Sequence, residues 1–536
     1  MAQATEPEIG RLLPRCFANW SETRTGKTRT VIEAAQRLFE RREIDRVIVV
    51  APASVRDGVW FDPDPDVGQL ARYLRVPALV TRFHARKATW GRDSISRERS
   101  LRWLVTNYEF VRVPARLAEL LQIADERTVL VLDEAHAVKN HRAAQTKACA
   151  KLRARCGWIW QLTATPTTDD GIGDIYAQAA ILDRRIIGVK NFWEYRARYA
   201  ILGGFKGKEI VGWRHALKRG CCERPATSAV HGPGAQADEV QTALSSYVVR
   251  RLKAECLDLP PKLDPVTLTV ALGKESWALY RQMRDDAVAW LDANASASAA
   301  VAGARVMRLA QITSGHVGGV KALLPCGCGE FGADCPRCGG TGGVEEHAAP
   351  RDVGREKLDF LIEWLAATWR EEPAAKIIVW SRWRREVERA YQELWRTSEF
   401  IPPSVISRSI SRLWGGQPAE ERAAALRLLH PQTAPPGPAV VIGHPRVGGA
   451  GLDFAAASWV LRLSSDHNLA DRIQSDDRPH GPGQTRSIWY GDVVATGPNG
   501  EPTVDRTILL SLRRKLRGAE WTARAWLAAL QEEQRA

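Results

Sequence analysis

The sequence has no long hydrophobic run, and its first residues lack the pattern of a targeting segment. No stretch reaches the roughly 18 consecutive apolar residues of a membrane-spanning helix. The segment from Met1 to Cys16 has no apolar core behind a basic start, as a secretory signal would have. We therefore expect a cytosolic protein that has no membrane partner.

Acidic side chains are too few to balance the basic ones. The chain has 62 Asp and Glu residues against 76 Lys and Arg residues, which gives a net charge of +14. Arginine supplies most of the positive charge, and guanidinium groups suit repeated contacts to a phosphate backbone. The excess of positive charge favours a polyanionic partner. A basic composition can also serve solubility alone, so charge leaves both interpretations open.

Cysteine is scarce and unevenly placed: six of the ten cysteines are scattered, and four crowd together. Cys326 with Cys328, and Cys335 with Cys338, form two close thiol pairs flanked by glycines, which permit the tight turns needed to point both sulfurs at one ion. In a reducing compartment this cluster predicts a closed, structural zinc site with four thiolates. A redox pair and unrelated buried thiols are the alternatives.

The length of 536 residues exceeds what one hydrophobic core supports, so two large domains with insertions are expected. Short apolar runs alternate with helix-like stretches in two regions, which predicts two parallel α/β sheets covered by helices. The runs lie at 47–53, 103–108, 129–133 and 158–166 in the first region, and at 376–380, 439–443, 458–461 and 488–490 in the second.

The alternation fails between the two regions. Residues 203–234 are rich in glycine and carry several basic side chains, which indicates an inserted protrusion. Its charges form either a solvated face or a basic prong beside a DNA track. Residues 275–291 have a helical pattern and lead into the Ala/Ser-rich stretch 293–304, which is either exposed helix or linker.

A phosphate-binding pattern opens the first region. Thr25, Gly26, Lys27 and Thr28 precede an apolar-periodic helix. Such a segment can wrap the phosphates of a nucleotide with backbone N–H groups, a Lys ammonium and a magnesium-binding hydroxyl. The strict pattern has a glycine where this chain has Ser21, so a second motif is needed to support the prediction.

The second motif is a pair of carboxylates at the end of a buried strand. The run 129–133 ends in Asp133, and Glu134 follows directly. Two carboxylates in this position hold magnesium and orient an attacking water in nucleotide hydrolases. Together, the loop and the acidic pair predict a site for ATP and magnesium.

The order of these motifs resembles superfamily 2 helicases, specifically the Swi/Snf-type double-stranded-DNA translocases of the shorter kind seen in phages and bacteria. Segments similar to motifs Ia, II, III, V and VI are 51–54, 133–136, 162–166, 448–453 and 474–484. Segments typical of this particular branch are 133–140, 174–176, 249–253 and 259–262.

The resemblance implies two RecA-like lobes that bind ATP between them and move along duplex DNA, in a bacterial or phage-infected host cytoplasm. Branched and single-stranded DNA are further candidate partners, and protein partners are unknown. The implied domains are a first, ATP-binding lobe at 1–189, a protrusion and linker at 190–265, a helical linker with the zinc insert at 266–350, and a second lobe at 351–536.

The resemblance also implies roles for individual residues. Lys27 would contact phosphate, and Thr28 and Asp133 would bind magnesium. Glu134 would orient the attacking water, and Arg478 would act across the cleft as an arginine finger. Nucleotide contacts would come from Thr25, Gly26, Lys27, Thr28, Gly449, Gly451 and Gln474, and coupling to DNA from Thr163, Thr165 and Gln474.

Three positions depart from the family pattern. Arg24 stands where the family has glycine, and the glutamine that reads adenine has no counterpart, since Gln3 is the only glutamine before the loop. The second arginine of motif VI is replaced by Gly481. An arginine finger contributes about 10³–10⁵ in rate. Two functions therefore stay open: an ATP-dependent DNA translocase or helicase acting in replication, recombination or repair, and an ATP-gated DNA-binding module that hydrolyses ATP weakly.

Overall fold

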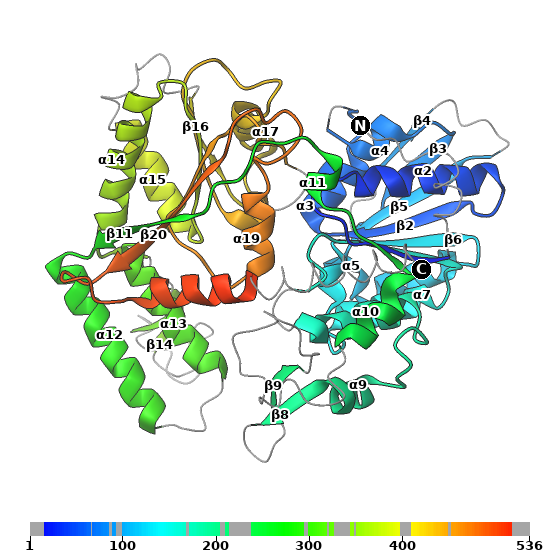
Figure 1. Cartoon of the computed structure of the whole chain (residues 1–536), viewed down its shortest axis with the longest axis horizontal. Coiled ribbons are helices and arrows are strands. Elements are labelled where there is room, and N and C mark those ends of the chain that lie inside the picture. The colour runs from blue at the N-terminus through cyan, green and yellow to red at the C-terminus, as the bar shows by residue number, and fades with distance from the viewer. Residues whose placement is uncertain are drawn as a thin grey trace, which may run out of the picture. The chain divides into compact units, whose positions relative to one another are not determined.

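The computed structural model describes residues 15–65, 67–84, 88–92, 99–167, 171–203, 209–213, 237–293, 299–318, 321–325, 343–347, 350–396, 409–448 and 452–516. The chain divides into two compact units. The first comprises residues 1–259, 468–477 and 513–536, and the second comprises 260–467 and 478–512. Each unit has its own sheet (Figure 1).

The first unit is built on a sheet with the strand order β10-β1-β7-β6-β2-β5-β3-β4. Its strands are β1 (Cys16–Asn19), β2 (Arg46–Ala51), β3 (Ala78–Arg82), β4 (Ala88–Arg92), β5 (Leu101–Asn107), β6 (Thr128–Asp133), β7 (Trp158–Leu162) and β10 (Val248–Val249). The pairs are parallel except for β3 with β4. Strand β6 is buried along its whole length, as expected for a strand covered on both faces.

Helices cover both faces of this sheet. Helices α2 (Lys27–Glu40) and α4 (Gln69–Tyr73) lie on one face, and α5 (Tyr108–Val111) and α7 (Ala144–Arg153) lie on the other (Figure 1). Helix α2 buries Val31, Ile32, Ala35 and Leu38, whose helical spacing forms one apolar stripe. The other helices before residue 260 are α3 (Ala53–Val55), α6 (Pro114–Ile123), α8 (Ile175–Leu182), α9 (Phe192–Tyr199), α10 (Ala237–Ser245) and α11 (Lys253–Cys256).

The second unit is built on an all-parallel sheet with the order β11-β20-β19-β16-β18-β17. Its strands are β11 (Val266–Ala271), β16 (Lys376–Trp380), β17 (Ile410–Leu413), β18 (Ala439–Gly443), β19 (Trp459–Arg462) and β20 (Trp489–Thr496). The helices of this unit include α12 (Lys274–Ala293), α13 (Ala299–Thr313), α14 (Glu356–Glu371), α15 (Arg384–Arg396), α17 (Ala419–Leu429) and α18 (Pro445–Gly448). Helix α19 (Leu469–Asp476) lies in the segment 468–477 of the first unit.

The predicted α/β class and the predicted strands in both regions are confirmed. Strand β10 lies in the segment predicted as protrusion and linker, and β11 lies in the segment predicted as helical linker. Each sheet therefore extends past its predicted lobe boundary. The reason is that both strands are joined to their sheets by parallel pairing with strands that are distant in sequence.

Several predictions about the insertions concern residues outside the described ranges. The predicted protrusion is described only at the hairpin of β8 (Ala200–Gly203) and β9 (Glu209–Trp213). The four clustered cysteines, within 326–342, also lie outside the described residues. The stretch 293–304 is helical from Ala299 onward. In the part of the chain that the structure describes, no helix is long and apolar enough to cross a membrane.

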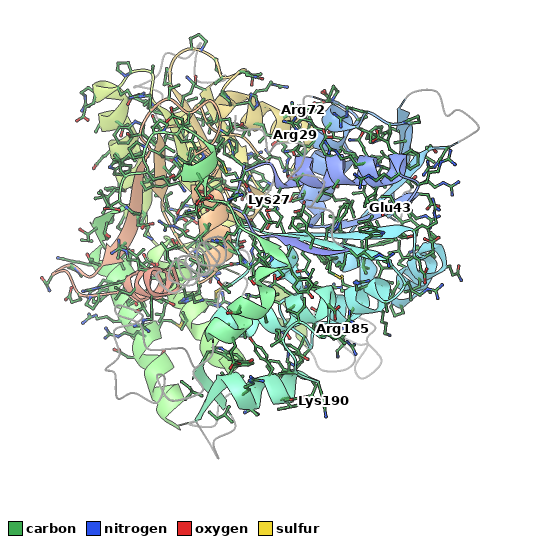
Figure 2. All side chains as sticks on the ribbon, turned by 45° about the vertical axis from the view of Figure 1, so that its right-hand side comes forward. Lys27, Arg29, Glu43, Arg72, Arg185 and Lys190 are labelled. Atoms are coloured by element: carbon green, nitrogen blue, oxygen red, sulfur yellow. The ribbon has the colours of Figure 1, made fainter. Side chains whose placement is uncertain are left out.

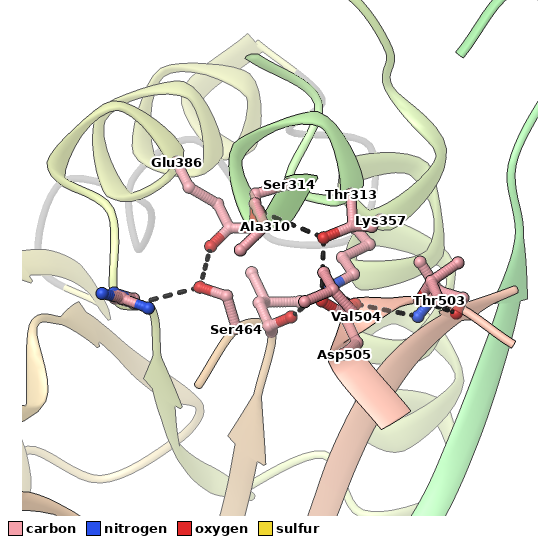
Figure 3. Close-up of polar contacts among 12 residues, drawn as sticks. Ala310, Thr313, Ser314, Lys357, Glu386, Ser464, Thr503, Val504 and Asp505 are labelled. Atoms are coloured by element: carbon pink, nitrogen blue, oxygen red, sulfur yellow. Dashed lines mark hydrogen bonds and ion pairs between the residues drawn. The ribbon is translucent and has the colours of Figure 1, made fainter. Parts of the chain in front are cut away.

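A buried ion pair joins distant segments of the second unit (Figure 3). The Lys357 ammonium on α14 donates to the Asp505 carboxylate at 2.7 Å and to the Leu463 carbonyl at 2.7 Å. Asp505 also accepts hydrogen bonds from Thr313 Oγ1 and from the backbone N–H of Ala495. One carboxylate therefore connects α13, α14 and β20, and every charge in the group has a partner.

Because this pair is buried, removing one member should be costly. We expect Asp505→Ala to lower the free energy of unfolding by about 3–5 kcal/mol, since it leaves the Lys357 ammonium buried without its counterion. The matched control is Arg385→Ala, which breaks the exposed ion pair with Asp352 and should cost no more than about 1 kcal/mol. Urea unfolding followed by tryptophan fluorescence measures both, and equal losses would contradict this account.

Candidate nucleotide site

Three predicted motifs meet at one edge of the first sheet because parallel strands end there together. Strand β1 pairs with β7, with Asn19 beside Leu162, and β6 pairs with β7, with Asp133 beside Leu162. The phosphate loop follows β1, Glu134 follows β6, and Thr163 follows β7. The carboxyl ends of parallel strands are the usual position of a ligand site in such sheets.

The phosphate loop ends at the start of α2. Gly26 is the N-cap residue of this helix and has a φ of 89°, a left-handed conformation that favours glycine. No side chain caps the helix, so its first N–H groups are available to an anion. Arg24, where the family has glycine, also has a left-handed φ of 64°. The family pattern therefore has glycine at a position where the backbone of this loop is left-handed.

Lys27 is held by the loop that it follows. Its ammonium donates to the carbonyls of Ser21 and Glu22, each at 2.8 Å, and Figure 2 labels it on α2. Burial lowers the pKa of Lys27, while the negative charges of Glu134 and Asp133 act in the opposite direction. The two carboxylates thus help to keep the ammonium charged, as a phosphate-binding lysine must be.

Asp133 is buried, with 7% of its surface exposed. Burial raises its pKa to about 6, and the negative charge of Glu134 adds to this rise. Trp60 opposes it, because its indole N–H donates to Asp133 Oδ2 at 2.7 Å. The other oxygen, Oδ1, accepts from the backbone N–H of Glu134 at 2.9 Å. Both oxygens of the carboxylate are therefore oriented by hydrogen bonds.

Sequence reasoning missed two aromatic residues that support Asp133. Trp60 donates to its carboxylate, and the Tyr108 hydroxyl donates to its backbone carbonyl at 2.7 Å. Trp60 lies in the helical turn 56–61 and Tyr108 at the start of α5. Neither belongs to a motif, and only the fold brings them to the end of β6.

Glu134 connects to the residues predicted to couple the site to DNA. It has a left-handed φ of 51°, and its carboxylate lies 3.3 Å from His136 Nδ1. The same ring nitrogen lies 3.3 Å from Thr163 Oγ1, which accepts a hydrogen bond from the Thr165 backbone at 3.1 Å. A continuous polar chain therefore joins Glu134 to the end of β7, through a histidine to which the sequence analysis gave no role.

Thr28 and Asp133 are the predicted magnesium ligands. Over the described ranges, no group of three or more His, Cys, Asp or Glu side chains is arranged to hold a metal ion. A hydroxyl and one carboxylate nevertheless fit magnesium, which keeps several waters and is held by one or two protein ligands together with substrate phosphates. The raised pKa of Asp133 fits this role as well, because a nearby cation stabilises the charged form.

The residues predicted from motifs V and VI are described only in part. Gln474 on α19 is buried. Arg478 is 6% exposed, and its Nη1 donates to the Leu452 carbonyl at 3.3 Å. Gly449 and Gly451 lie outside the described residues. The contacts of these four residues with a nucleotide stay predictions.

Two family models match the chain. The SNF2-related domain matches residues 21–314, and the helicase conserved C-terminal domain matches residues 356–483. The first match includes the phosphate loop, the acidic pair and the segment 249–253, and the second includes Gln474 and Arg478.

Similar proteins include a SWI/SNF-related matrix-associated actin-dependent regulator of chromatin subfamily A member 3-like 1 from Arabidopsis thaliana. It is 22% identical over 422 residues, 68% of this chain, and the aligned part spans only 46% of that relative's length. Among solved structures, the Sulfolobus solfataricus SWI2/SNF2 ATPase core in complex with double-stranded DNA is 17% identical, with 99% of this chain and 95% of that chain covered and a TM-score of 0.36. The Sulfolobus core domain alone is 18% identical, with coverages of 90% and 81% and a TM-score of 0.34.

The contact between Trp60 and Asp133 can be tested directly. Trp60→Phe should weaken binding of magnesium-ATP by about 10–100-fold, because the carboxylate loses a donor that orients it and lowers its pKa. The matched control is Trp103→Phe. Trp103 is fully buried and stacks on Trp60, but its indole nitrogen has no hydrogen-bond partner among the described residues.

Binding of a fluorescent ATP analogue, titrated with magnesium, measures both variants. Trp103→Phe should bind as the unmodified protein does. If the two variants weaken binding equally, aromatic packing accounts for the effect and the hydrogen bond to Asp133 does not.

Proposed function

Because the chain belongs to the SNF2-related family of helicase-type ATPases, we propose that it hydrolyses ATP in response to DNA and uses the energy to move along a duplex. The observation that best supports this is the grouping of Lys27, Asp133 and Glu134 at one sheet edge of the unit that carries the SNF2-related domain. The two family models together include every strand of the two sheets except β1 and β20, which fits a motor with two lobes.

In the proposed reaction each residue at this edge has one task. Lys27 and the first N–H groups of α2 bind phosphate oxygens, and Thr28 and Asp133 hold a hydrated magnesium ion, which neutralises charge on the phosphates. Glu134 orients the attacking water and accepts its proton. His136 then connects the state of Glu134 to Thr163 through its ring nitrogen.

Duplex DNA is the proposed track. The net charge of +14 supports a polyanionic partner, and the segments 133–140 and 249–253 are those typical of double-stranded-DNA translocases. The segment 133–140 also contacts 174–176, another segment typical of this branch, since Lys139 Nζ lies 3.8 Å from the buried carboxylate of Asp174. We place the biological role in replication, recombination or repair.

A second candidate is an ATP-gated DNA-binding module that hydrolyses ATP weakly. The sequence favours it at Gly481, where the family has its second motif VI arginine. The remaining arginine, Arg478, is 94% buried and donates to a backbone carbonyl. In the proposed motor, Arg478 would therefore have to leave the Leu452 carbonyl to reach a phosphate.

ATPase rates without nucleic acid and with duplex DNA, single-stranded DNA or RNA separate these functions. We expect the strongest stimulation by duplex DNA. Lys27→Ala should abolish hydrolysis by removing the phosphate-binding charge, and Glu134→Gln should keep ATP binding while stopping hydrolysis. Lys151→Ala, which changes an exposed lysine on α7, is the control and should have no effect.

The outcomes distinguish the two candidates. Slow hydrolysis that DNA does not stimulate, together with ATP-dependent DNA binding, would favour the gated module. Normal hydrolysis by Lys27→Ala would refute the assignment of the phosphate loop.

We also propose a structural zinc ion held by Cys326, Cys328, Cys335 and Cys338. The spacing of the thiols is the main support. The hairpin of β13 (Lys321–Pro325) and β14 (Gly343–His347) adds to it, since Pro325 pairs with Gly343 and brings the two ends of the cysteine segment together. A four-thiolate ion at such a position would stabilise the insert and take no part in catalysis.

Metal analysis tests this second proposal. Freshly purified, reduced protein should contain about one zinc ion per chain, and Cys335→Ser with Cys338→Ser should lose it. Cys256→Ser is the matched control, because Cys256 is an exposed free cysteine outside the cluster, and it should retain zinc. Protein that lacks zinc would contradict the proposal.

A further inference from the structure

The phosphate loop has a second set of contacts, on the side of the segment 249–253. Strand β10 pairs in parallel with β1, and the pairing continues past the end of β1, with the backbone N–H of Trp20 donating to the Val249 carbonyl at 2.8 Å. The backbone N–H of Glu22 then donates to the Arg251 carbonyl at 3.0 Å. The segment after β10 therefore runs along the phosphate loop itself.

Two side chains of the loop complete this pairing. Ser21 is 2% exposed, and its hydroxyl accepts from the backbone N–H of Arg251 at 3.0 Å. The Glu22 carboxylate accepts from the backbone N–H of Lys253, the first residue of α11, at 2.7 Å. Ser21 occupies the position where strict phosphate loops have glycine. A glycine there would have no acceptor to offer Arg251.

The same two residues hold the catalytic lysine. The carbonyls of Ser21 and Glu22 accept from the Lys27 ammonium, and the Glu22 carbonyl also accepts from Thr25 Oγ1. The ammonium has three N–H donors and gives one to each of these carbonyls. A phosphate that binds the third donor draws the ammonium toward itself and away from the carbonyls. Any shift of the Ser21–Glu22 backbone that follows acts directly on Arg251 and Lys253.

The segment held in this way also leads into one of the covalent links between the units. Helix α11 ends at Cys256, and the chain passes from the first unit to the second between Leu259 and Pro260. A few residues thus separate the contacts of Glu22 from the start of the second unit.

We infer that Ser21 and Glu22 are positioning residues that couple occupation of the nucleotide site to the segment 250–256. In the free protein they hold Lys27 through their carbonyls and the segment through their side chains. Contact of Lys27 with phosphate alters its bonds to the Ser21 and Glu22 carbonyls. The side chains of Ser21 and Glu22 then transmit this change to the segment 250–256. This inference rests on the proposed ATP site and names a mechanism by which that site would act on one of the connections between the units.

Hydrogen–deuterium exchange of the full chain, with and without magnesium-ATP, tests the coupling. In the unmodified protein, nucleotide should change the exchange rate of the amides in 250–256. In Glu22→Ala these amides should exchange at least about tenfold faster without nucleotide, because a hydrogen bond to a charged group is lost, and nucleotide should no longer change their rate. Each variant is compared at a concentration of magnesium-ATP that saturates it in a titration with the fluorescent ATP analogue.

Two variants serve as controls. Glu22→Gln keeps an oxygen acceptor for the Lys253 N–H and should restore the response of the unmodified protein. Glu43→Ala changes an exposed glutamate just beyond the far end of α2 from Lys27 (Figure 2) and should leave the response intact. If Glu22→Ala does not fold, Ser21→Ala removes the other acceptor, and the same loss of response is expected.

The results separate this inference from the function on which it rests. Nucleotide binding that leaves the exchange of 250–256 unchanged in the unmodified protein would overturn the coupling alone, as would a normal response in both Glu22→Ala and Ser21→Ala. Failure of the unmodified protein to bind magnesium-ATP would overturn the proposed function and the coupling with it.

Discussion

Parallel pairing of β1, β7 and β6 is the constraint on which the nucleotide site depends. Asn19, Leu162 and Asp133 lie side by side in register, so the segments that follow them have to leave the sheet at the same edge. A slip of one residue between two of these strands would turn every side chain of the shifted strand to the opposite face. The burial of β6 and β7 on both faces makes that slip costly, so core packing sets the positions of the polar groups.

This arrangement buries a charged carboxylate, that of Asp133, which is unfavourable. Asp133 is almost enclosed and lies next to a second carboxylate, and both effects raise its pKa. The indole N–H of Trp60 and the ammonium of Lys27 favour the charged form, so the protein compensates part of the penalty before any ligand arrives. The remaining imbalance favours a cation, since a divalent ion relieves repulsion between carboxylates. In the proposed site, the repulsion between the two carboxylates would favour binding of a metal–nucleotide complex.

The sequence was informative where a segment carries its own pattern. The apolar runs of β2, β5, β6 and β7 are long enough to predict buried strands. The phosphate loop and the acidic pair can be recognised from their own residues. By contrast, β1 has four residues and β10 has two, and strands this short are stabilised by their neighbours rather than by their own composition. Strand β11 is as long as β2 and β6, but only one of its six residues is buried, so it has no buried apolar run, and pairing with the distant β20 places it in the second sheet.

The supporting contacts of the site were not predictable for a related reason. Trp60 and Tyr108 are separated from Asp133 by 73 and 25 residues, and no spacing rule connects an indole or a phenol to a carboxylate at such distances. Arg24 is an intermediate case. The family pattern indicated that the position usually has glycine, but only its φ of 64° gives the reason, which is a left-handed backbone.

The position of β1 in the sheet also has a consequence for folding. Its two neighbours are β7 and β10, and Ala18 lies beside Gln161 on one side and Val248 on the other. Contacts between residues so far apart in sequence require closure of long loops and form slowly. A ribosome releases β1 before β7 and β10, so the chain must be synthesised beyond Val249 before β1 has both partners. The phosphate loop is therefore among the last parts of the first unit to become complete, and the protein cannot bind a nucleotide in its native manner until most of that unit has folded.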